Sequence, residues 1–252
     1  MLKLHLHTMV CSLSWRKKSA VVALLALSCM SSKGHEMAYT KDIKKYRSRR
    51  DFAHTPEPRG TAKKVTSKKP IFVIHKHDAS HLHYDLRLEV GGVLPSWAVP
   101  KGPSLDPRQK RLAMQTEDHP YEYAQFEGVI PEGNYGAGTV MIWDYGTYDN
   151  IKRIAGKLVP MKQCLKDGRI EIELHGQKLH GGFALIRTGQ GGDDRKWLLI
   201  KMRDDMASAR RNPVSSQTKS ALTGRTMREI ARDEGPESDT KTVHRTRRRK
   251  SA

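Results

Sequence analysis

Residues 75–87, HKHDASHLHYDLR, hold four of the chain's 12 histidines, and an aspartate and an arginine follow the last of them. Within this stretch His77, His83 and Asp85 follow the spacing H-x5-H-x-D. Neutral imidazoles and a carboxylate suit Mn²⁺ or Zn²⁺ better than Mg²⁺, which prefers oxygen ligands. Arg87, two residues beyond the aspartate, would point beside the metal and bind a phosphate through two hydrogen bonds. The stretch therefore predicts a divalent metal site that handles phosphate.

An expected strand over residues 82–90 would bring these side chains together, because successive side chains of a strand point to opposite faces. One face would carry His83, Asp85, Arg87 and Glu89. His77, at the end of the preceding strand or in the turn, would reach the same face. We expect His75 and His81 to support the site rather than bind the metal. The alternative is an ordinary polar strand face whose histidines make structural hydrogen bonds.

Further charged and titratable residues fall near expected strand ends. They are Lys101, Arg111, Glu117, His119 and Tyr123. Together they offer phosphate-neutralising donors and a titratable imidazole, which metal-assisted phosphoryl hydrolysis needs at the attacking and leaving oxygens. A structural role for His119 is the alternative. Residues 130–138, IPEGNYGAG, have the glycines of a loop with close backbone approach but not the Lys-Ser/Thr ending of a P-loop.

Between about residues 70 and 204, short apolar or β-branched runs alternate with turn-forming residues. This rhythm is typical of an antiparallel β barrel or sandwich. The expected strands are 71–76, 82–90, 93–100, 111–117, 138–145, 169–174, 182–188 and 196–202. Gly91 and Gly92 predict a two-residue hairpin turn, and residues 157–168 a short helix. We expect a mainly β fold, a single compact antiparallel β barrel with short flanking helices and disordered basic tails.

The charge balance points to a polyanionic partner. The chain has 46 Lys+Arg against 27 Asp+Glu, a formal net charge of +19. Such a field attracts nucleic acid, although a merely solubilising charge is the alternative. Cys11, Cys29 and Cys164 have no paired spacing, so neither a disulfide framework nor a zinc motif is indicated. This usage fits a reducing, cytosolic compartment.

Three regions are expected along the chain. Residues 1–36 are an N-terminal extension containing a signal-like run at 16–29, and we favour a true start at Met37 over a secretory signal. Residues 37–205 would form the barrel domain. Residues 206–252 would be a basic, mostly disordered tail with a short helix near Thr223. The terminal basic run of this tail would contact phosphates non-specifically or remain a solvated tail.

As one string, FVIHKHDASHLHYDLRLEVGGVLPSWAVPKGPSLDPRQKRLAMQTEDHPYEYAQFEGVIPEGNYGAGTVMIWDYGTYD closely resembles the 3′-phosphoesterase domain of bacterial DNA ligase D and its stand-alone relatives. The likeness runs from RDFAHTPEP at 50–58 to about Lys201 and includes LHGGFALIRT. It implies a Mn²⁺-dependent hydrolase of DNA 3′ ends, a 3′-phosphodiesterase and 3′-phosphomonoesterase. Such an enzyme removes a terminal ribonucleoside and then the 3′-phosphate, leaving 3′-OH ends for repair and non-homologous end joining.

The resemblance also implies roles for particular residues. Metal ligands fall on His77, His83 and Asp85, holding Mn²⁺ or another divalent transition metal. Catalytic positions fall on Arg87, Lys101, Arg111, Glu117, His119 and Tyr123. Phosphate and substrate contacts fall on Arg50, Asp51, Arg87, Lys101, Arg111 and His119. One departure is His75, where the family commonly has Gln, and a fourth imidazole there could alter metal choice or pH dependence.

The expected setting follows from the same resemblance. LKDGR at 165–169 does not have the K-x-D-G spacing of a ligase's nucleotidyl-lysine motif. We therefore expect the phosphoesterase module alone, cytoplasmic and nucleoid-associated, with no membrane partner. It would act on 3′ ends of DNA primer–templates or duplexes, with a separately encoded ligase, polymerase and Ku-type end-binding protein expected by analogy. The alternatives are a non-catalytic DNA-end-binding barrel and a phosphodiesterase acting on RNA.

Overall fold

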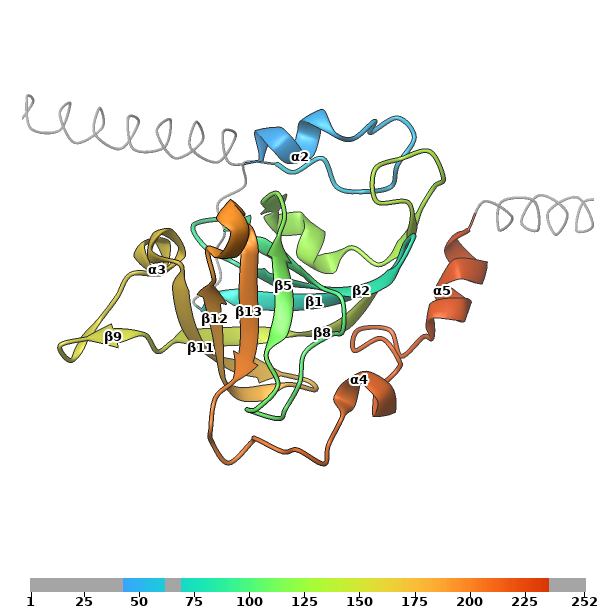
Figure 1. The fold of residues 1–252 in the computed structure, drawn as a ribbon. Helices are drawn as coiled ribbons and strands as arrows, with labels where there is room; N and C mark the ends of the chain where they lie inside the picture. The colour runs from blue at the N-terminus through green and yellow to red at the C-terminus, as the bar shows by residue number, and fades with distance from the viewer. Residues whose placement is uncertain (1–42, 62–68, 236–252) are drawn as a thin grey trace, which may run out of the picture. The chain divides into compact units, whose positions relative to one another are not determined.

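The computed structural model describes residues 43–61 and 69–235 (Figure 1). Eight strands close into an antiparallel barrel in the order β1-β2-β4-β5-β13-β12-β11-β8, because β8 pairs back onto β1, and β7 extends the sheet beside β8. The strands are β1 (Ile71–Asp78), β2 (Leu82–Leu88), β3 (Val93–Leu94), β4 (Ser96–Val99), β5 (Arg111–Gln115), β6 (His119–Pro120), β7 (Gly128–Ile130), β8 (Gly138–Asn150), β9 (Arg153–Ile154), β10 (Lys157–Leu158), β11 (Arg169–Gly176), β12 (His180–Arg187) and β13 (Lys196–Lys201). The helices are α2 (Lys44–Ser48), η1 (Tyr121–Gln125), α3 (Met161–Asp167), η2 (Gln190–Gly192), α4 (Pro213–Ser216) and α5 (Met227–Glu234). The expected β barrel with short flanking helices is confirmed.

Large apolar side chains fill the inside of the barrel. Trp97, Trp143 and Trp197 are fully buried there together with Phe72 and Leu86. Since side chains alternate along a strand, the other set on β1 and β2 must point to the outside of the barrel. The histidine-rich face of these two strands is therefore on the outside of the barrel. The segments that carry Arg50 and Tyr123 partly cover it.

Local turn chemistry explains two details of the strand pattern. Gly91 and Gly92 have φ values of 67° and 92°, and the flanking Val90 and Val93 form a β-bridge, so the expected hairpin is present. The expected strand 93–100 is divided into β3 and β4 at Pro95, which lacks the N–H that a continuous ladder requires. The expected helix at 157–168 begins only at Met161, after the short strand β10.

The described structure contains the short helix expected near Thr223, as α5, but residues 206–235 pack on the barrel instead of forming a mostly disordered tail. Helix α5 begins with a capping box in which Thr226 and Glu229 exchange hydrogen bonds, and its Ile230 is fully buried. This segment has too few apolar residues for its sequence to predict that it contributes to the core. The extension 1–36, the start at Met37 and the final basic residues 236–252 lie outside the described residues.

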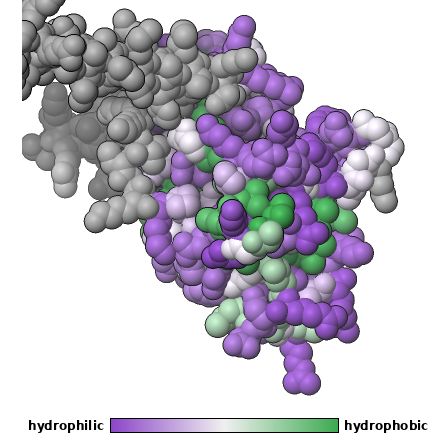
Figure 2. Space-filling view, turned by 90° about the vertical axis from the view of Figure 1, so that its left-hand side faces the viewer, coloured by the Kyte–Doolittle hydropathy of each residue, from purple (hydrophilic) through white to green (hydrophobic). Residues whose placement is uncertain are grey.

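The surface is largely polar. Figure 2, a view onto the side of α3 and β9, shows predominantly hydrophilic residues around a smaller apolar area. Ile154 and Leu158, on the hairpin formed by β9 and β10, are among the exposed large hydrophobic side chains. Among the helices of the described ranges, none combines the length and apolar character needed to cross a membrane.

Candidate active site

The three predicted metal ligands meet on the outer face of the β1–β2 hairpin. The strand register places His77 directly opposite His83. His77 Nδ1 lies 3.8 Å from Asp85 Oδ2, and His83 Nε2 lies 3.5 Å from Asp85 Oδ1. All three potential ligand atoms lie within 4.8 Å of one another. Two imidazoles and a carboxylate converging in this way fit a divalent transition metal.

Backbone carbonyls hold both imidazoles in the tautomer that a metal needs. His77 Nε2 lies 2.9 Å from the carbonyl oxygen of Gly136, and His83 Nδ1 lies 2.8 Å from that of His81. A carbonyl oxygen only accepts, so each of these nitrogens carries the proton. His77 Nδ1 and His83 Nε2 are left with free lone pairs directed toward Asp85. Such outer hydrogen bonds orient metal-binding histidines, and the residues therefore fit a cation.

Arg87 holds Asp85 in place. Its guanidinium donates to Asp85 Oδ2 at 2.9 Å, to Ser96 Oγ at 2.9 Å and to His75 Nδ1 at 3.2 Å. Burial disfavours the ionised Asp85 carboxyl, but the charge of the Arg87 guanidinium outweighs this effect and holds the pKa of that carboxyl well below its usual range. Arg87 is therefore a support of the carboxylate as well as a wall of the cavity, and His75 supports Arg87.

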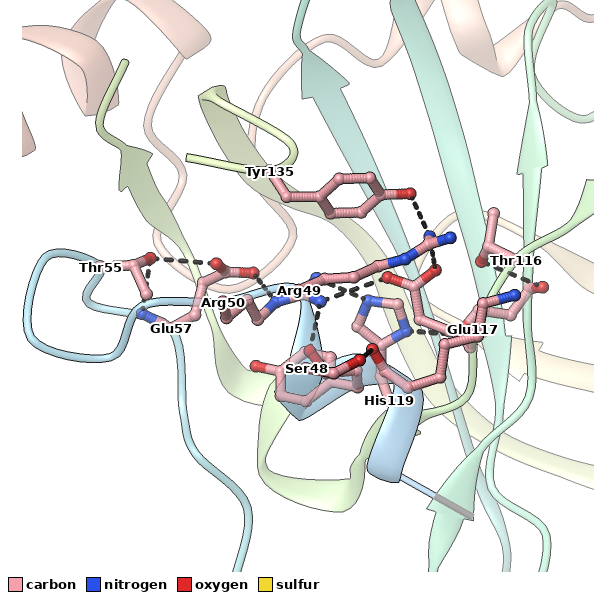
Figure 3. A network of polar contacts seen from close by, with 12 residues as sticks. Ser48, Arg49, Arg50, Thr55, Glu57, Thr116, Glu117, His119 and Tyr135 are labelled. Atoms are coloured by element: carbon pink, nitrogen blue, oxygen red, sulfur yellow. Dashed lines mark hydrogen bonds and ion pairs between the residues drawn. The ribbon is translucent and has the colours of Figure 1, made fainter. Parts of the chain in front are cut away.

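A second polar network packs the segment after α2 against the barrel (Figure 3). Arg50 donates to Glu57 at 2.9 Å and to Glu117 at 3.2 Å, and its guanidinium stacks 3.8 Å from the ring centre of Tyr46. The Arg50 side chain is 4% exposed and those of Glu57 and Glu117 are 0% and 3% exposed. Two buried carboxylates thus compensate the positive charge of the buried Arg50 guanidinium. These two ion pairs also fix the position of the guanidinium.

His119 is a neutral imidazole at the centre of this network. Its Nδ1 lies 2.9 Å from the carbonyl oxygen of Glu117, so Nδ1 carries the proton, and Nε2 lies 3.4 Å from Arg50. Burial, and then the charges of Arg87 and Arg50, hold the pKa of His119 well below its usual value. Nε2 is therefore unprotonated, and its lone pair faces the guanidinium of Arg50. This environment disfavours a standing imidazolium that would hold phosphate.

Both networks open into one cavity of about 250 Å³. Tyr123 forms part of its wall, packing edge-to-face on His119 at 4.7 Å and under the Arg87 guanidinium at 4.7 Å. The predicted site residues that line this cavity are Arg50, His77, His83, Asp85, Arg87, Glu117, His119 and Tyr123. The barrel thus joins a potential metal site to a cluster of buried guanidinium groups, which is an arrangement suited to phosphoryl chemistry.

The sequence is similar to those of known proteins. Residues 75–187 match the family described as the DNA ligase D 3′-phosphoesterase domain. This part of the chain belongs to that family. The multifunctional non-homologous end joining protein LigD of Pseudomonas aeruginosa is 44% identical over 194 residues, which are 76% of this chain and 22% of that protein. The corresponding DNA repair protein LigD of Mycobacterium tuberculosis is 47% identical over 162 residues, 64% of this chain and 20% of that protein.

The chain thus spans about a fifth of the length of the curated relatives it matches. The matched 3′-phosphoesterase range begins at His75 and includes all three potential metal ligands. Arg50, which precedes that range, lines the cavity, and Glu57, which also precedes it, holds the Arg50 guanidinium at 2.9 Å. The site of this phosphoesterase domain is therefore assembled from a segment beyond the matched range as well.

Three predicted residues lie apart from the shared cavity of the phosphoesterase domain. Lys101 and Arg111 line a separate open depression of about 570 Å³ together with Lys110. This depression begins at Pro100, close in the chain to Ala98, which lines the first cavity. Asp51 is exposed and pairs with His54 at 2.8 Å instead of facing the cavity. The phosphoesterase domain thus presents two neighbouring basic surfaces instead of one continuous pocket.

Sequence reasoning did not select several residues that shape the site. Glu57 and Tyr46 hold the Arg50 guanidinium. The Arg49 guanidinium lies 2.9 Å from the Glu117 carboxylate and donates to the Tyr135 hydroxyl at 2.7 Å. A signal for Glu57 was its position in the RDFAHTPEP segment, only seven residues after Arg50. Tyr135 lies in the loop 130–138, whose glycines predict a close backbone approach but no role for the aromatic side chain.

Proposed function

We propose that this chain is a Mn²⁺-dependent 3′-phosphoesterase that processes DNA 3′ ends. It would first release a 3′-terminal ribonucleoside and then hydrolyse the remaining 3′-phosphate to leave a 3′-OH. The observation that carries the proposal is the convergence of His77, His83 and Asp85 beside buried guanidinium groups in one cavity. A protein that only bound DNA ends would need the basic charge but not a preorganised set of metal ligands.

His77 Nδ1, His83 Nε2 and an Asp85 oxygen would hold the cation. When bound, the cation would act as a Lewis acid that polarises the phosphate and favours attack by water. Arg87 keeps Asp85 ionised and oriented through its 2.9 Å hydrogen bond. Arg50 and Arg87, which line the cavity, would stabilise negative charge on the phosphate oxygens in the transition state.

The remaining groups support proton transfer and substrate binding. His119 Nε2, unprotonated in this environment, is placed to exchange a proton with the water or the leaving oxygen. Glu117 and Tyr123 position Arg50, Arg87 and His119 instead of reacting themselves. Lys101 and Arg111 lie in the neighbouring depression and would contact further phosphates of the strand.

The cellular setting is carried over from relatives. The curated relatives are named as non-homologous end joining proteins, two of them in Pseudomonas aeruginosa and Mycobacterium tuberculosis. A chain with the proposed activity would supply the end-cleaning step of such a pathway. The 3′-OH end that it leaves is the substrate that both extension and sealing require, so we propose that a polymerase, a ligase and a Ku-type end-binding protein act with it.

The decisive experiment is an end-processing assay with the purified full chain and Mn²⁺. One primer–template would end in a single ribonucleotide and a second in a 3′-phosphate, with all-RNA versions of both in parallel. We expect conversion of both DNA ends to 3′-OH. His83→Ala should abolish both reactions, because only two of the three ligands would remain.

A matched control separates loss of the site from loss of the fold. His180→Ala removes an exposed histidine of β12 that does not line the cavity, and it should retain both reactions. DNA binding without turnover by the wild type under several divalent metals would instead favour the end-binding alternative. Faster conversion of the all-RNA ends would favour the RNA phosphodiesterase.

A further inference from the structure

Tyr135 is a half-exposed aromatic side chain at the edge of the candidate active site. It is 48% exposed, and it lines the same cavity as His77, His83 and Asp85. No feature of the proposed hydrolysis uses it. A large, half-exposed aromatic side chain beside a potential phosphate site is suited to stacking against a nucleobase.

The loop that carries Tyr135 is tied directly to the metal ligands. The carbonyl oxygen of the next residue, Gly136, accepts the hydrogen bond from His77 Nε2 at 2.9 Å. At the end of the loop, Gly138 passes so close to β1 that a Cβ there would lie 2.2 Å from the Asp78 carbonyl oxygen. Tyr135 is thus held one residue away from a group that orients a metal ligand.

Two arginines fix the Tyr135 ring. The Arg49 guanidinium lies 4.8 Å from the ring centre and donates to the phenol oxygen at 2.7 Å, as Figure 3 shows, and the Arg50 guanidinium lies 5.6 Å from the same centre. Arg49 is in turn anchored by Glu117 at 2.9 Å. A ring held in this way loses little further freedom when a base packs on it, so its stacking contributes more fully to binding.

We propose that Tyr135 is the platform on which the base of the leaving ribonucleoside stacks, and hence a specificity-determining residue for the first of the two reactions. This inference rests on the proposed function. In that reaction the water oxygen bonds to phosphorus, the bond from phosphorus to the 5′-oxygen of the terminal nucleoside breaks, and that oxygen takes up a proton. The leaving nucleoside is directly attached to the phosphate at the metal site, within reach of Tyr135.

The second reaction supplies an internal control. Its substrate ends in a 3′-phosphate, so the nucleoside that would stack on Tyr135 is absent. Tyr135→Ala should therefore lower the ratio of the kcat/KM for ribonucleoside release to that for phosphate removal by about tenfold, the typical effect of removing the platform for one stacked base. Tyr135→Phe keeps the ring and should keep the ratio. Tyr145→Ala, at an exposed tyrosine of β8 that does not line the cavity, should also keep it.

A second readout needs neither metal nor turnover. A primer ending in 5-iodouridine would be bound without divalent metal, irradiated, and the crosslinked peptide identified by mass spectrometry. We expect an adduct on Tyr135 that is absent from Tyr135→Ala. An adduct at another residue, no adduct, or an unchanged kinetic ratio in Tyr135→Ala would overturn the inference. If the wild type forms the Tyr135 adduct but hydrolyses neither substrate, the proposed function fails while the base contact stands.

Discussion

At the scale of single residues, the protonation state of His119 can be tested through stability. Its pKa in the folded protein is lowered by burial and by Arg87 and Arg50, whereas in the unfolded chain it is near 6.5. Below pH 6.5 the unfolded state therefore binds a proton that the folded state does not, and stability falls as the pH falls. His119→Asn, which places an amide donor where Nδ1–H was, should remove this dependence.

The measurement is the free energy of unfolding in urea between pH 5 and 8. The wild type should lose stability relative to His119→Asn below pH 6.5, by up to about 1.4 kcal/mol per pH unit for one proton. Circular dichroism at pH 8 would verify that the variant folds. Parallel pH profiles for the two proteins would show that His119 is not held neutral by its surroundings.

Arg87 provides a second residue-scale prediction, on metal affinity. Arg87→Lys keeps the positive charge, but an ammonium group cannot reproduce the simultaneous contacts to Asp85, Ser96 and His75. Because the outer partner orients the carboxylate, Mn²⁺ affinity measured by calorimetry should fall about 10–100-fold. Arg187→Lys, outside the cavity, should bind Mn²⁺ as the wild type does. Equal Mn²⁺ affinity in both variants would show that Arg87 does not support the metal site.

At the scale of elements, one buried carboxylate fastens residues 206–235 to the barrel. Glu127, with a side chain 4% exposed, accepts hydrogen bonds from the Ile142 amide, the hydroxyls of Ser220 and Thr223, and the Arg225 guanidinium. Glu127→Ala would leave these donors without their partner. We expect a loss of about 3 kcal/mol in the free energy of unfolding and faster proteolysis within residues 206–235.

A carboxylate that is less deeply buried is the control for this prediction. Glu171 on β11 pairs with Lys152 at 3.5 Å and Arg169 at 2.7 Å, nearer to solvent than Glu127. Glu171→Gln should cost less than about 1 kcal/mol, because solvent screens such pairs. If the two substitutions cost the same, the C-terminal segment is not held by Glu127, and its packing must depend on Ile230 instead.

At the scale of the whole molecule, the net charge of +19 should govern how binding responds to salt. Truncation after Gly235 removes six Lys and Arg residues while keeping every described element. The slope of log affinity for DNA against log salt should become shallower, by up to about 0.9 for each phosphate that these residues neutralise in the full chain. Binding titrations by fluorescence anisotropy at several salt concentrations would measure it. An unchanged slope would mean that these residues do not contact the DNA backbone.

The grouping of His77, His83 and Asp85 could be predicted because it depends on local geometry. His83, Asp85 and Arg87 lie on one strand with a period of two, and a short turn brings His77 to the opposing position. The eight barrel strands were recognisable for a similar reason, since each is a short apolar run bounded by turn residues. Residue type and spacing alone therefore determined the fold class and the centre of the candidate site.

Tertiary structure decided which distant residues complete that centre. Closure of the barrel, the packing of α2 and the path of the loop 130–138 bring Arg50 and Tyr135 to the cavity that the histidines line, whereas Lys101 and Arg111 line a separate depression. Such contacts join residues that lie far apart in the chain, as Arg50 and Glu117 do at a separation of 67 positions. A repeating pattern along a strand carries no information about them, because they depend on how separate segments pack around the whole barrel.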